Sequence, residues 1–373
     1  MAGIGSTRAR VALVGLGEAG FSLHLPALRG IAGAEVVGAC DTDPGRRARA
    51  AQSFRVPVFD DFDAMLERAS PDVVIIGTPP DSHADHCLRS LAAGAHVICE
   101  KPFVSGLEEA DRVIAAARAA GRRVALNHEF REMPIFRALR AAAGDRVIFA
   151  QVWQLMDLAP WDEPGWRGQM RQRTLYEAGV HLVDFLIALF GEKPHAVSAT
   201  VSTCGVRAGD TDAVVLATLH FSRGRLAQMV QNRLCKGQTQ YFEVRAELPD
   251  ASLRASFGGR ARISAGLHRS SRPHFRIDYG VSGLAWKEVG SERTILGRNP
   301  TDPGMIATRY VFENTLAAFR DGSEPPASAE MGRDVLEVIA ACYHAAATGQ
   351  RVDLEGDQRP ELAALRMGTA PVG

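Results

Sequence analysis

Apolar and polar positions along the first third of the chain separate short strands from longer helices. Short apolar runs predict buried β-strands at 10–14, 35–40, 73–77, 96–99 and 123–127, with a weaker one near 56–59. Between them, helical spacing of apolar residues predicts helices at 18–30, 43–53, 61–69, 82–93 and 105–120. Ser105-x-x-Glu108 has the pattern of a capping box. This alternation predicts an α/β domain with a doubly wound parallel sheet and helices on both faces.

The pattern changes after about residue 127, where strands become longer and helices fewer. Strands are predicted at 146–155, 195–203, 212–221, 225–232, 239–247, 251–257, 274–278 and 284–289, with a hairpin turn at 222–224. A buried helix is predicted at about 175–190, and two late helices near 303–320 and 329–347. This pattern predicts an α+β domain with a large, mostly antiparallel, open-faced sheet. We place the first domain at 1–126, the second at 127–353 and a polar, loosely ordered tail at 354–373.

Charge and cysteine content narrow the class of protein. The chain has 43 basic and 43 acidic residues, and this balance argues against a nucleic-acid partner. The six cysteines form no CxxC pair, which predicts reduced core thiols and neither disulfides nor a metal site. No apolar run is long enough to span a membrane, and the apolar run near the start is too short for a signal peptide. We therefore expect a cytoplasmic protein with no membrane partner.

A glycine-rich turn joins the first predicted strand to the first predicted helix. It reads GLGEAG and comprises Gly15, Gly17, Glu18, Ala19 and Gly20. Glycines at this spacing allow a tight turn, close approach of a pyrophosphate to the backbone, and close packing of the helix. This motif in this context predicts a Rossmann domain that binds a dinucleotide.

Asp41 ends the second predicted strand, 21 residues after Gly20. An acid at this place accepts hydrogen bonds from the adenosine ribose and repels a 2′-phosphate, which favours NAD over NADP. Arg46 and Arg47 lie close enough in the sequence to leave NADP open. The alternative role of Asp41 is to cap the helix that follows Pro44.

Two further strand ends carry polar residues. Thr78, Pro79 and His83 follow the strand at 73–77 and, with Glu100 and Lys101, are candidate cofactor contacts. His83 either contacts the cofactor or stabilises the start of its helix. Glu100 and Lys101 follow the strand at 96–99, where Pro102 ends it. Ligands of open α/β sheets bind outside the carboxyl ends of the strands, so Lys101 is a candidate for chemistry.

The predicted helix at 175–190 is apolar at nearly every position but carries three ionisable residues. Glu177, His181 and Asp184 follow the spacing i, i+4, i+7, which on a regular helix places them within a stripe roughly 60° wide. A histidine beside carboxylates is suited to general acid–base catalysis. In the structural alternative, Glu177 belongs to a capping box with Thr174, and Asp184 satisfies a buried His181.

These motifs together resemble the glucose–fructose oxidoreductase/inositol dehydrogenase (Gfo/Idh/MocA) family. The matching stretches are GLGEAG at 15–20, CD at 40–41, TPPDSH at 78–83, EKP at 100–102, NHEFR at 127–131, and GWR at 165–167 through EAGVHLVD at 177–184. The resemblance implies an NAD(P)-dependent oxidoreductase that acts on a secondary hydroxyl of a sugar, cyclitol or related polyol between its two domains. Separately, the predicted open sheet face needs covering, so we expect a homodimer or homotetramer.

The resemblance assigns roles to particular residues. Lys101 and His181 match the catalytic lysine and histidine of the family, and Glu177 matches a catalytic position that is often Asp. Asn127, Arg131, Trp161, Trp166, Arg167 and Asp184 are the expected substrate contacts, with ordinary packing as the alternative for the tryptophans. The chain departs from the family where Arg171-Gln172-Arg173 replaces a glycine-rich stretch. These arginines suggest either an anionic or extended substrate, or a solvated loop.

The sequence leaves the mechanism and the function class partly open. His181 is expected to act as the general base, oriented by Glu177 or Asp184, while Lys101 stabilises a developing alkoxide. In the alternative, Lys101 is the base and His181 relays the proton. A sensor of dinucleotides or sugars on the same scaffold, and a redox-neutral elimination through transient oxidation, are the competing functions. Retention of a lysine, a histidine and an acid favours the enzyme.

Overall fold

The computed structural model describes residues 8–156, 165–203, 212–235, 241–258, 262–268, 271–278, 283–355 and 359–368. The chain divides into two compact units. The first comprises 1–132, 304–336 and 363–368, and the second comprises 133–303, 337–362 and 369–373. Each unit therefore contains segments that lie far apart in the sequence.

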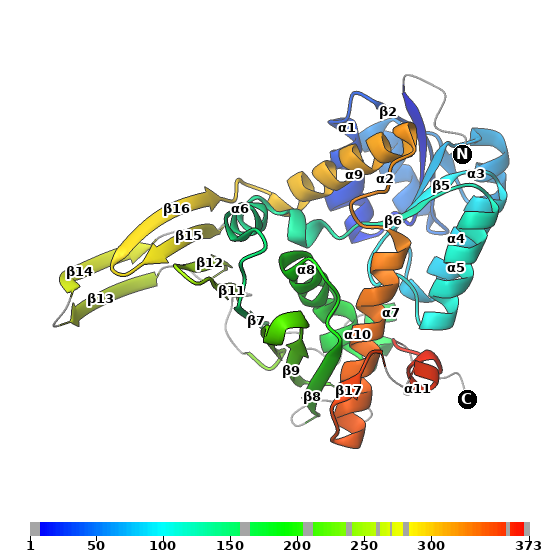
Figure 1. Ribbon diagram of the computed structural model, residues 1–373. Helices are drawn as coiled ribbons and strands as arrows, with labels where there is room; N and C mark the ends of the chain where they lie inside the picture. Colours follow the sequence, from blue (N-terminus) through cyan, green and yellow to red (C-terminus); the bar gives the residue numbers. More distant parts are fainter. Residues whose placement is uncertain are drawn as a thin grey trace. The chain divides into compact units, whose positions relative to one another are not determined.

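The first unit contains a six-stranded parallel sheet with the order β3-β2-β1-β4-β5-β6 (Figure 1). Its strands are β1 (Ala9–Val14), β2 (Ala34–Cys40), β3 (Val58–Phe59), β4 (Val73–Ile76), β5 (His96–Cys99) and β6 (Val124–Leu126). Every residue of β4 and β5 is buried, as expected for strands covered on both faces. The predicted parallel sheet is confirmed, and its order reverses between β1 and β4, where ligands of such sheets bind.

The helices of the first unit follow the predicted alternation. A π-helical turn (Gly20–His24) continues into α1 (Leu25–Arg29). The other helices are α2 (Pro44–Phe54), α3 (Phe62–Ala69), α4 (His83–Ala92), α5 (Leu107–Ala119) and α9 (Pro303–Asp321). The predicted capping box of α5 is wrong. The helix begins after Gly106, which makes no side-chain cap, and the Ser105 hydroxyl donates to Asp81 instead.

Helix α9 belongs to the first unit, whereas the sequence placed it in the second domain. Val311, Phe312, Leu316 and Phe319 of this helix lie in the same buried cluster as apolar residues of β1, α1 and β4. The difference arises because periodicity reveals the apolar face of a helix but not the surface against which that face packs.

The second unit contains a nine-stranded sheet with the order β16-β15-β12-β11-β7-β10-β9-β8-β17. Its strands are β7 (Phe149–Leu155), β8 (Ala196–Ser202), β9 (Val214–His220), β10 (Leu226–Asn232), β11 (Tyr241–Glu247), β12 (Ser252–Phe257), β15 (Leu284–Val289), β16 (Glu292–Arg298) and β17 (Val352–Asp353). Strands β7 and β10 pair in parallel, and the other neighbours pair in antiparallel fashion. The predicted mostly antiparallel sheet and the hairpin turn at 222–224 between β9 and β10 are confirmed.

Several elements of the second unit were not predicted from the sequence. They are α6 (Pro134–Ala143), α7 (Trp166–Gln169), β16, and β13 (Arg262–His268), which pairs with β14 (Ser271–Asp278) in a separate two-stranded sheet. The late helix α10 (Ala329–Thr348) confirms the predicted one and is followed by Gly349 at φ 69°. A left-handed glycine at this place is a common helix end.

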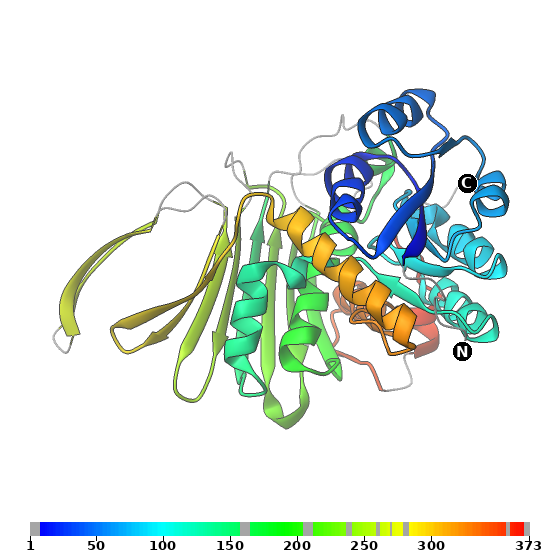
Figure 2. The ribbon, with the colours of Figure 1, turned by 90° about the horizontal axis from the view of Figure 1, so that it is seen from above.

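Helices α6 and α8 (Val180–Phe190) lie against one face of the nine-stranded sheet (Figure 2). The Phe136 ring of α6 lies 5.2 Å from the rings of both Phe185 in α8 and Phe242 in β11. Successive side chains of a strand point to opposite faces. Trp153, Val230 and Leu216 are in register on three neighbouring strands, and they are half-buried or, for Leu216, 48% exposed. They form an apolar row on the face away from these helices.

The last described segment is packed, so the predicted loosely ordered tail is wrong for residues 359–368. It contains α11 (Arg359–Ala363), and the side chains of Leu362 and Met367 are buried. The Met367 N–H donates to the Ser105 carbonyl at 2.7 Å, and Arg366 forms an ion pair with Glu109. Apolar residues spaced between polar ones gave too weak a periodic signal to predict this packing.

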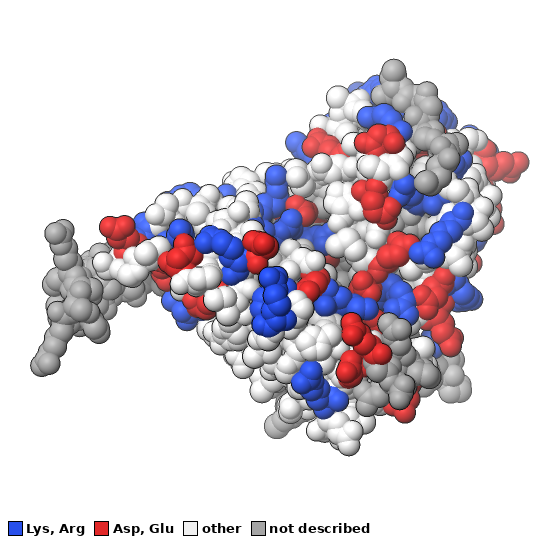
Figure 3. Space-filling model, viewed as in Figure 1, with Lys and Arg blue, Asp and Glu red and all other residues white. Residues whose placement is uncertain are grey.

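Among the described residues, charged side chains of both signs lie on the surface, and most cysteines are buried. Acidic and basic side chains are interspersed over the face drawn in Figure 3. Cys40, Cys87, Cys99 and Cys342 are buried free thiols, and burial raises the pKa of Cys342 to about 12. Among the described residues, no helix is both long and apolar enough to cross a membrane.

Candidate functional site

The glycine-rich turn follows β1 directly, and each of its glycines has a different environment. Gly15 has a φ of 93°, and a Cβ there would lie 2.5 Å from the Gly77 carbonyl carbon. A Cβ on Gly20 would lie 2.8 Å from the Gly15 oxygen, whereas a Cβ on Gly17 would meet nothing within 4 Å. Gly15 and Gly20 are therefore required by packing, while the backbone at Gly17 is open to a ligand.

Asp41 connects the end of β2 to this turn. Its Oδ2 accepts the Leu16 N–H at 2.7 Å and its Oδ1 accepts the Asp43 N–H at 2.9 Å, with Arg46 3.5 Å away. The alternative role of Asp41 as cap of α2 is wrong, because Asp43 is the capping residue. Its Oδ1 accepts the N–H groups of Gly45 and Arg46, and the Arg46 bond is the main cause that lowers the pKa of Asp43.

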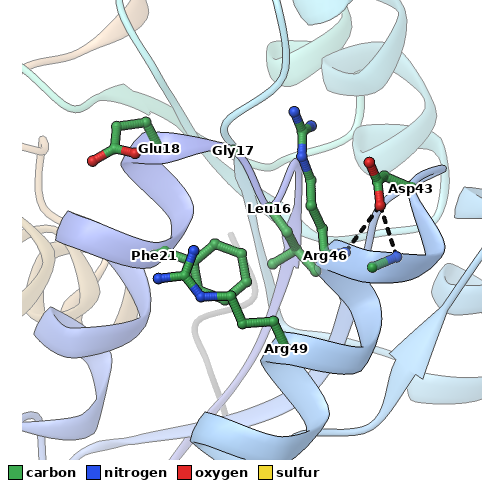
Figure 4. Close-up of a pocket in the computed structure, with 8 residues that line it drawn as sticks. Leu16, Gly17, Glu18, Phe21, Asp43, Arg46 and Arg49 are labelled. Carbon is green, nitrogen blue, oxygen red and sulfur yellow. Dashed lines mark hydrogen bonds between the residues drawn. The ribbon is translucent and has the colours of Figure 1, made fainter.

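A pocket of about 390 Å³ adjoins the glycine-rich turn and the first turns of α2 (Figure 4). It is lined by Leu16, Gly17, Glu18, Phe21, Asp43, Gly45, Arg46 and Arg49. The Arg49 guanidinium lies over the Phe21 ring, 4.1 Å from its centroid. The lining combines two apolar side chains, Leu16 and Phe21, with charged side chains of both signs and the open backbone at Gly17.

Glu100 lies at the centre of a buried hydrogen-bond network at the end of β5. Its Oε1 accepts from His24 Nε2 and from Asn127 Nδ2, both at 2.7 Å, and its Oε2 accepts the Lys101 N–H at 3.1 Å. Burial raises the pKa of Glu100, but the hydrogen bond and charge of His24, with Asn127 and Lys101, outweigh it and lower the pKa to about 2. The carboxylate is therefore ionised, and it joins the ends of β5 and β6 to the π-helical turn before α1. Sequence reasoning missed His24, which carries no signal beyond a histidine in an apolar helix.

His83 lies at the start of α4 and is fully buried. Its Nε2 lies 2.8 Å from the Thr78 carbonyl oxygen, and its Nδ1 lies 3.0 Å from the carbonyl oxygens of both Pro102 and Phe103. Burial is the main cause that lowers the pKa of His83. The ring thus joins the loop after β4 to the loop after β5, and these contacts are to carbonyl groups of loops instead of to N–H groups of its own helix.

In the second unit, the segment around Glu177 differs from the regular helix that the sequence predicted. Residues Arg173–Gly179 form a π-helical turn, and α8 begins at Val180. The regular i, i+4, i+7 stripe is therefore wrong for Glu177, while His181 and Asp184 are one turn apart on α8. All three are buried, with exposed fractions of 9% or less. Single π-helical turns occur often at functional sites.

The predicted capping box at Thr174 and Glu177 is also wrong. The Thr174 hydroxyl donates to the Asp212 carbonyl oxygen at 3.0 Å. The Glu177 carboxylate instead lies between two arginines, 2.6 Å from Arg167 Nε and 3.6 Å from Arg173 Nε. The two guanidinium groups fix the carboxylate of this candidate catalytic residue.

Asp212 holds the start of this π-helical turn, and sequence reasoning did not identify it. Its Oδ1 accepts the Arg173 N–H at 3.0 Å, and its Oδ2 accepts the Leu175 N–H at 2.8 Å and the Tyr343 hydroxyl at 2.7 Å. Burial is the main cause that raises the pKa values of Asp212 and Tyr343. No local motif reveals this role, because Asp212 precedes a strand far from the helix that it supports.

The remaining expected substrate contacts have different surroundings. Asn127 is buried and bonded to Glu100, and Arg131 is buried, donating to the Pro326 carbonyl. The Arg167 guanidinium lies over the Trp166 ring, 4.5 Å from its centroid. Trp161 lies outside the described residues. The first unit brings together the glycine-rich turn, Asp41 and the ends of β4, β5 and β6; the second brings together Arg167, Glu177 and the start of α8.

The chain matches known proteins over both units. Residues 9–128 match the model of the Gfo/Idh/MocA oxidoreductase family with an NAD-binding Rossmann fold, and residues 144–248 match the Gfo/Idh/MocA C-terminal domain. Inositol 2-dehydrogenase 4 of Saccharopolyspora erythraea is 32% identical over 85% of this chain and 95% of its own length. D-apiose dehydrogenase of Paraburkholderia graminis is 27% identical over 93% of this chain and 90% of its own length.

Solved structures share the fold. An oxidoreductase from Agrobacterium radiobacter, in complex with NAD+, L-tartaric acid and magnesium, matches with a TM-score of 0.78 and 17% identity, over 93% of this chain and 99% of its own. The WlbA dehydrogenase from Chromobacterium violaceum, in complex with NADH and UDP-GlcNAcA, matches with a TM-score of 0.75 and 21% identity, over 96% and 99%.

The buried Glu100 network generates a prediction about stability and pH. Because folding lowers the pKa of Glu100 from 4.5 to about 2, its contribution to stability is fully present above pH 4.5 and is lost as the pH falls towards 2. The contribution is on the order of 3 kcal/mol. Urea unfolding should therefore show Glu100→Gln less stable than the wild type at pH 7, with a difference that shrinks as the pH falls from 4.5 to about 2. Equal pH slopes for both proteins would contradict the network, and the exposed Glu67→Gln serves as control.

Proposed function

This chain belongs to the Gfo/Idh/MocA oxidoreductase family, and from this premise we propose that it transfers a hydride between NAD and a secondary alcohol or ketone of a sugar, cyclitol or related polyol. The observation that carries the proposal is the open backbone at Gly17 beside a pocket at the carboxyl edge of a parallel sheet. Relatives named as inositol and D-apiose dehydrogenases, which align over most of this chain, support the substrate class.

The residues present fit a dinucleotide. A side chain at position 17 would occupy space that is empty in this chain, so the glycine keeps the backbone accessible to a pyrophosphate. The Leu16 and Phe21 side chains give the adjoining pocket an apolar wall for an adenine. We propose NAD as the preferred cofactor, because the buried carboxylate of Asp41 is next to this pocket and would repel a 2′-phosphate.

When bound, the nicotinamide accepts or donates the hydride, and the chain's own residues must move the hydroxyl proton. We assign His181 as general base in the oxidation. Two carboxylates are candidates for orienting the His181 ring. One is Asp184, on the same face of the helix, and the other is Glu177, which lies between two arginines. We assign Lys101 to hydrogen-bond the reacting oxygen and stabilise the negative charge that develops there. Lys101 follows the buried Glu100 carboxylate in the chain, and its charge is one of the causes that lower the pKa of Glu100.

The first test is a panel of sugars and cyclitols assayed with NAD and NADP by the absorbance of the reduced cofactor. With any panel member that the wild type turns over, Lys101→Met and His181→Ala should each lower kcat by about 100-fold or more. General acid–base groups contribute about 10²–10⁴-fold to the rate. Binding of NADH, followed by fluorescence, should change little in His181→Ala.

Three outcomes of this test would count against the proposal. Near-normal kcat in both variants would refute the roles of Lys101 and His181. Tight NADH binding without turnover of any panel member would favour a sensor. Turnover of substrate without net change in the reduced cofactor would favour an elimination through transient oxidation.

The cofactor preference rests on the charge of Asp41 and can be tested by removing that charge alone. Asp41→Asn keeps an acceptor for the Leu16 N–H but is neutral. We expect the ratio of the NADPH and NADH dissociation constants, measured by fluorescence titration, to fall by about tenfold, which corresponds to about 1.4 kcal/mol. An unchanged ratio would show that Asp41 does not select the cofactor.

We further propose that a second copy of this chain covers the open face of the nine-stranded sheet in a homodimer or homotetramer. The apolar row of Trp153, Val230 and Leu216 on that face supports it, because exposed apolar rows on a sheet favour association. Light scattering should give a mass above that of one chain, and Leu216→Lys should lower it. A monomeric wild type would refute this proposal.

A further inference from the structure

Two fully buried histidines from different helices hold the residues on either side of Lys101. His24 belongs to the π-helical turn before α1 and bonds to Glu100, while His83 begins α4 and contacts Pro102 and Phe103. We propose that His24 and His83, the histidine pair, are positioning residues that fix the main chain at Lys101 for proton handling. This inference rests on the proposed role of Lys101.

The contact on the amino side runs from His24 through the Glu100 carboxylate to the Lys101 main chain. One oxygen of Glu100 is held by His24 Nε2 at 2.7 Å, and the other accepts the Lys101 N–H at 3.1 Å. The His24 ring is itself fixed by packing. A Cβ on Gly77 would lie 3.0 Å from its Cε1, and the Phe312 ring lies 5.7 Å away. The Glu100 carboxylate therefore has little freedom to move.

The contact on the carboxyl side is direct. His83 Nδ1 lies 3.0 Å from the carbonyl oxygens of both Pro102 and Phe103, the two residues that follow Lys101. On the other side of the ring, Nε2 lies 2.8 Å from the Thr78 carbonyl oxygen. The loop that carries Lys101 is thus tied to the loop after β4, which lies on the neighbouring strand of the sheet.

Burial shows that this role is one of positioning. Both histidines have an exposed fraction of 0%. They therefore act on a substrate only indirectly, through the residues to which they are bonded. Burying an imidazole is costly, and in each ring one nitrogen that offsets part of this cost is bonded to a neighbour of Lys101: Nε2 of His24 and Nδ1 of His83. A displacement of about 1 Å in a catalytic group can cost about 10²-fold in rate, and a lysine side chain has four rotatable bonds that magnify any freedom of its main chain.

The competing explanation is that both histidines merely stabilise the fold. His96 is a matched control, because it is a buried histidine in the same unit, at the opposite end of β5 from Lys101. It stacks on Phe319 with ring centroids 4.6 Å apart, and its Nδ1 accepts the Arg123 N–H at 3.1 Å. Substituting His96 therefore removes a buried, bonded imidazole from this sheet without touching either neighbour of Lys101.

The test uses substitutions that keep or remove one contact at a time. His24→Leu removes the bond to Glu100, whereas His24→Gln places an amide near the position of Nε2 and keeps it. His83→Gln keeps the contact to Thr78 and loses Pro102 and Phe103, whereas His83→Asn does the reverse. Each variant of the full chain is assayed for kcat, for the KM of its substrate and, by fluorescence, for NADH affinity. Its melting temperature is measured as well.

We expect His24→Leu and His83→Gln to lower kcat about 10- to 100-fold, with NADH dissociation constants within about threefold of the wild type. His24→Gln and His83→Asn should recover most of the lost kcat. His96→Leu should lower the melting temperature but leave kcat within about threefold. In a Lys101→Met background, His24→Leu should cause no further loss of kcat, because residues that act as a unit are not additive.

The outcomes separate this inference from the proposed function. If Lys101→Met keeps its kcat, the proposed role of Lys101 is wrong. If Lys101→Met loses kcat while His24→Leu and His83→Gln keep it, the positioning role is wrong. The positioning role also fails if kcat falls in all three histidine variants in proportion to the melting temperature, His96→Leu included. Should the leucine variant of His24 not fold, equal loss of kcat in His83→Gln and His83→Asn would overturn the inference.

Discussion

The ionised carboxylate of Glu100 is the interaction on which the candidate catalytic edge of the first unit depends. It is buried, yet its pKa falls to about 2, because His24 and Asn127 donate to it and because positive charge lies nearby. The three residues come from the helix after the glycine-rich turn and from the ends of β5 and β6. One ionised carboxylate therefore links the helix after the glycine-rich turn to the strand end that carries Lys101.

The second unit uses a comparable device around its own candidate catalytic helix. The buried Asp212 carboxylate accepts two main-chain N–H groups at the start of the π-helical turn, as well as the Tyr343 hydroxyl. A π-helical turn leaves main-chain groups without their regular partners, and a carboxylate from elsewhere in the chain can satisfy them. In both units, a buried carboxylate fixes the backbone next to a candidate catalytic residue.

Local pattern was sufficient wherever one segment carries its own physical signal. The glycine-rich turn, the fully buried strands β4 and β5, and the lysine after β5 were predicted because glycine spacing, apolar runs and a proline act over a few residues. Capping boxes failed at Ser105 and Thr174, since each hydroxyl bonds to a residue of a distant segment instead of to its own helix. Helix α9 was predicted as an element but assigned to the wrong unit.

The sequence by itself therefore determined the class of fold, the dinucleotide motif and the identity of Lys101 and His181 as candidates, because these depend on short-range spacing. Only the tertiary structure decided what each polar residue bonds to. It showed that Asp41 holds the glycine-rich turn, that Glu177 lies between two arginines, and that two buried histidines bracket Lys101. Such contacts join residues tens of positions apart, and a buried polar group takes whichever partner the packed core brings within hydrogen-bond distance.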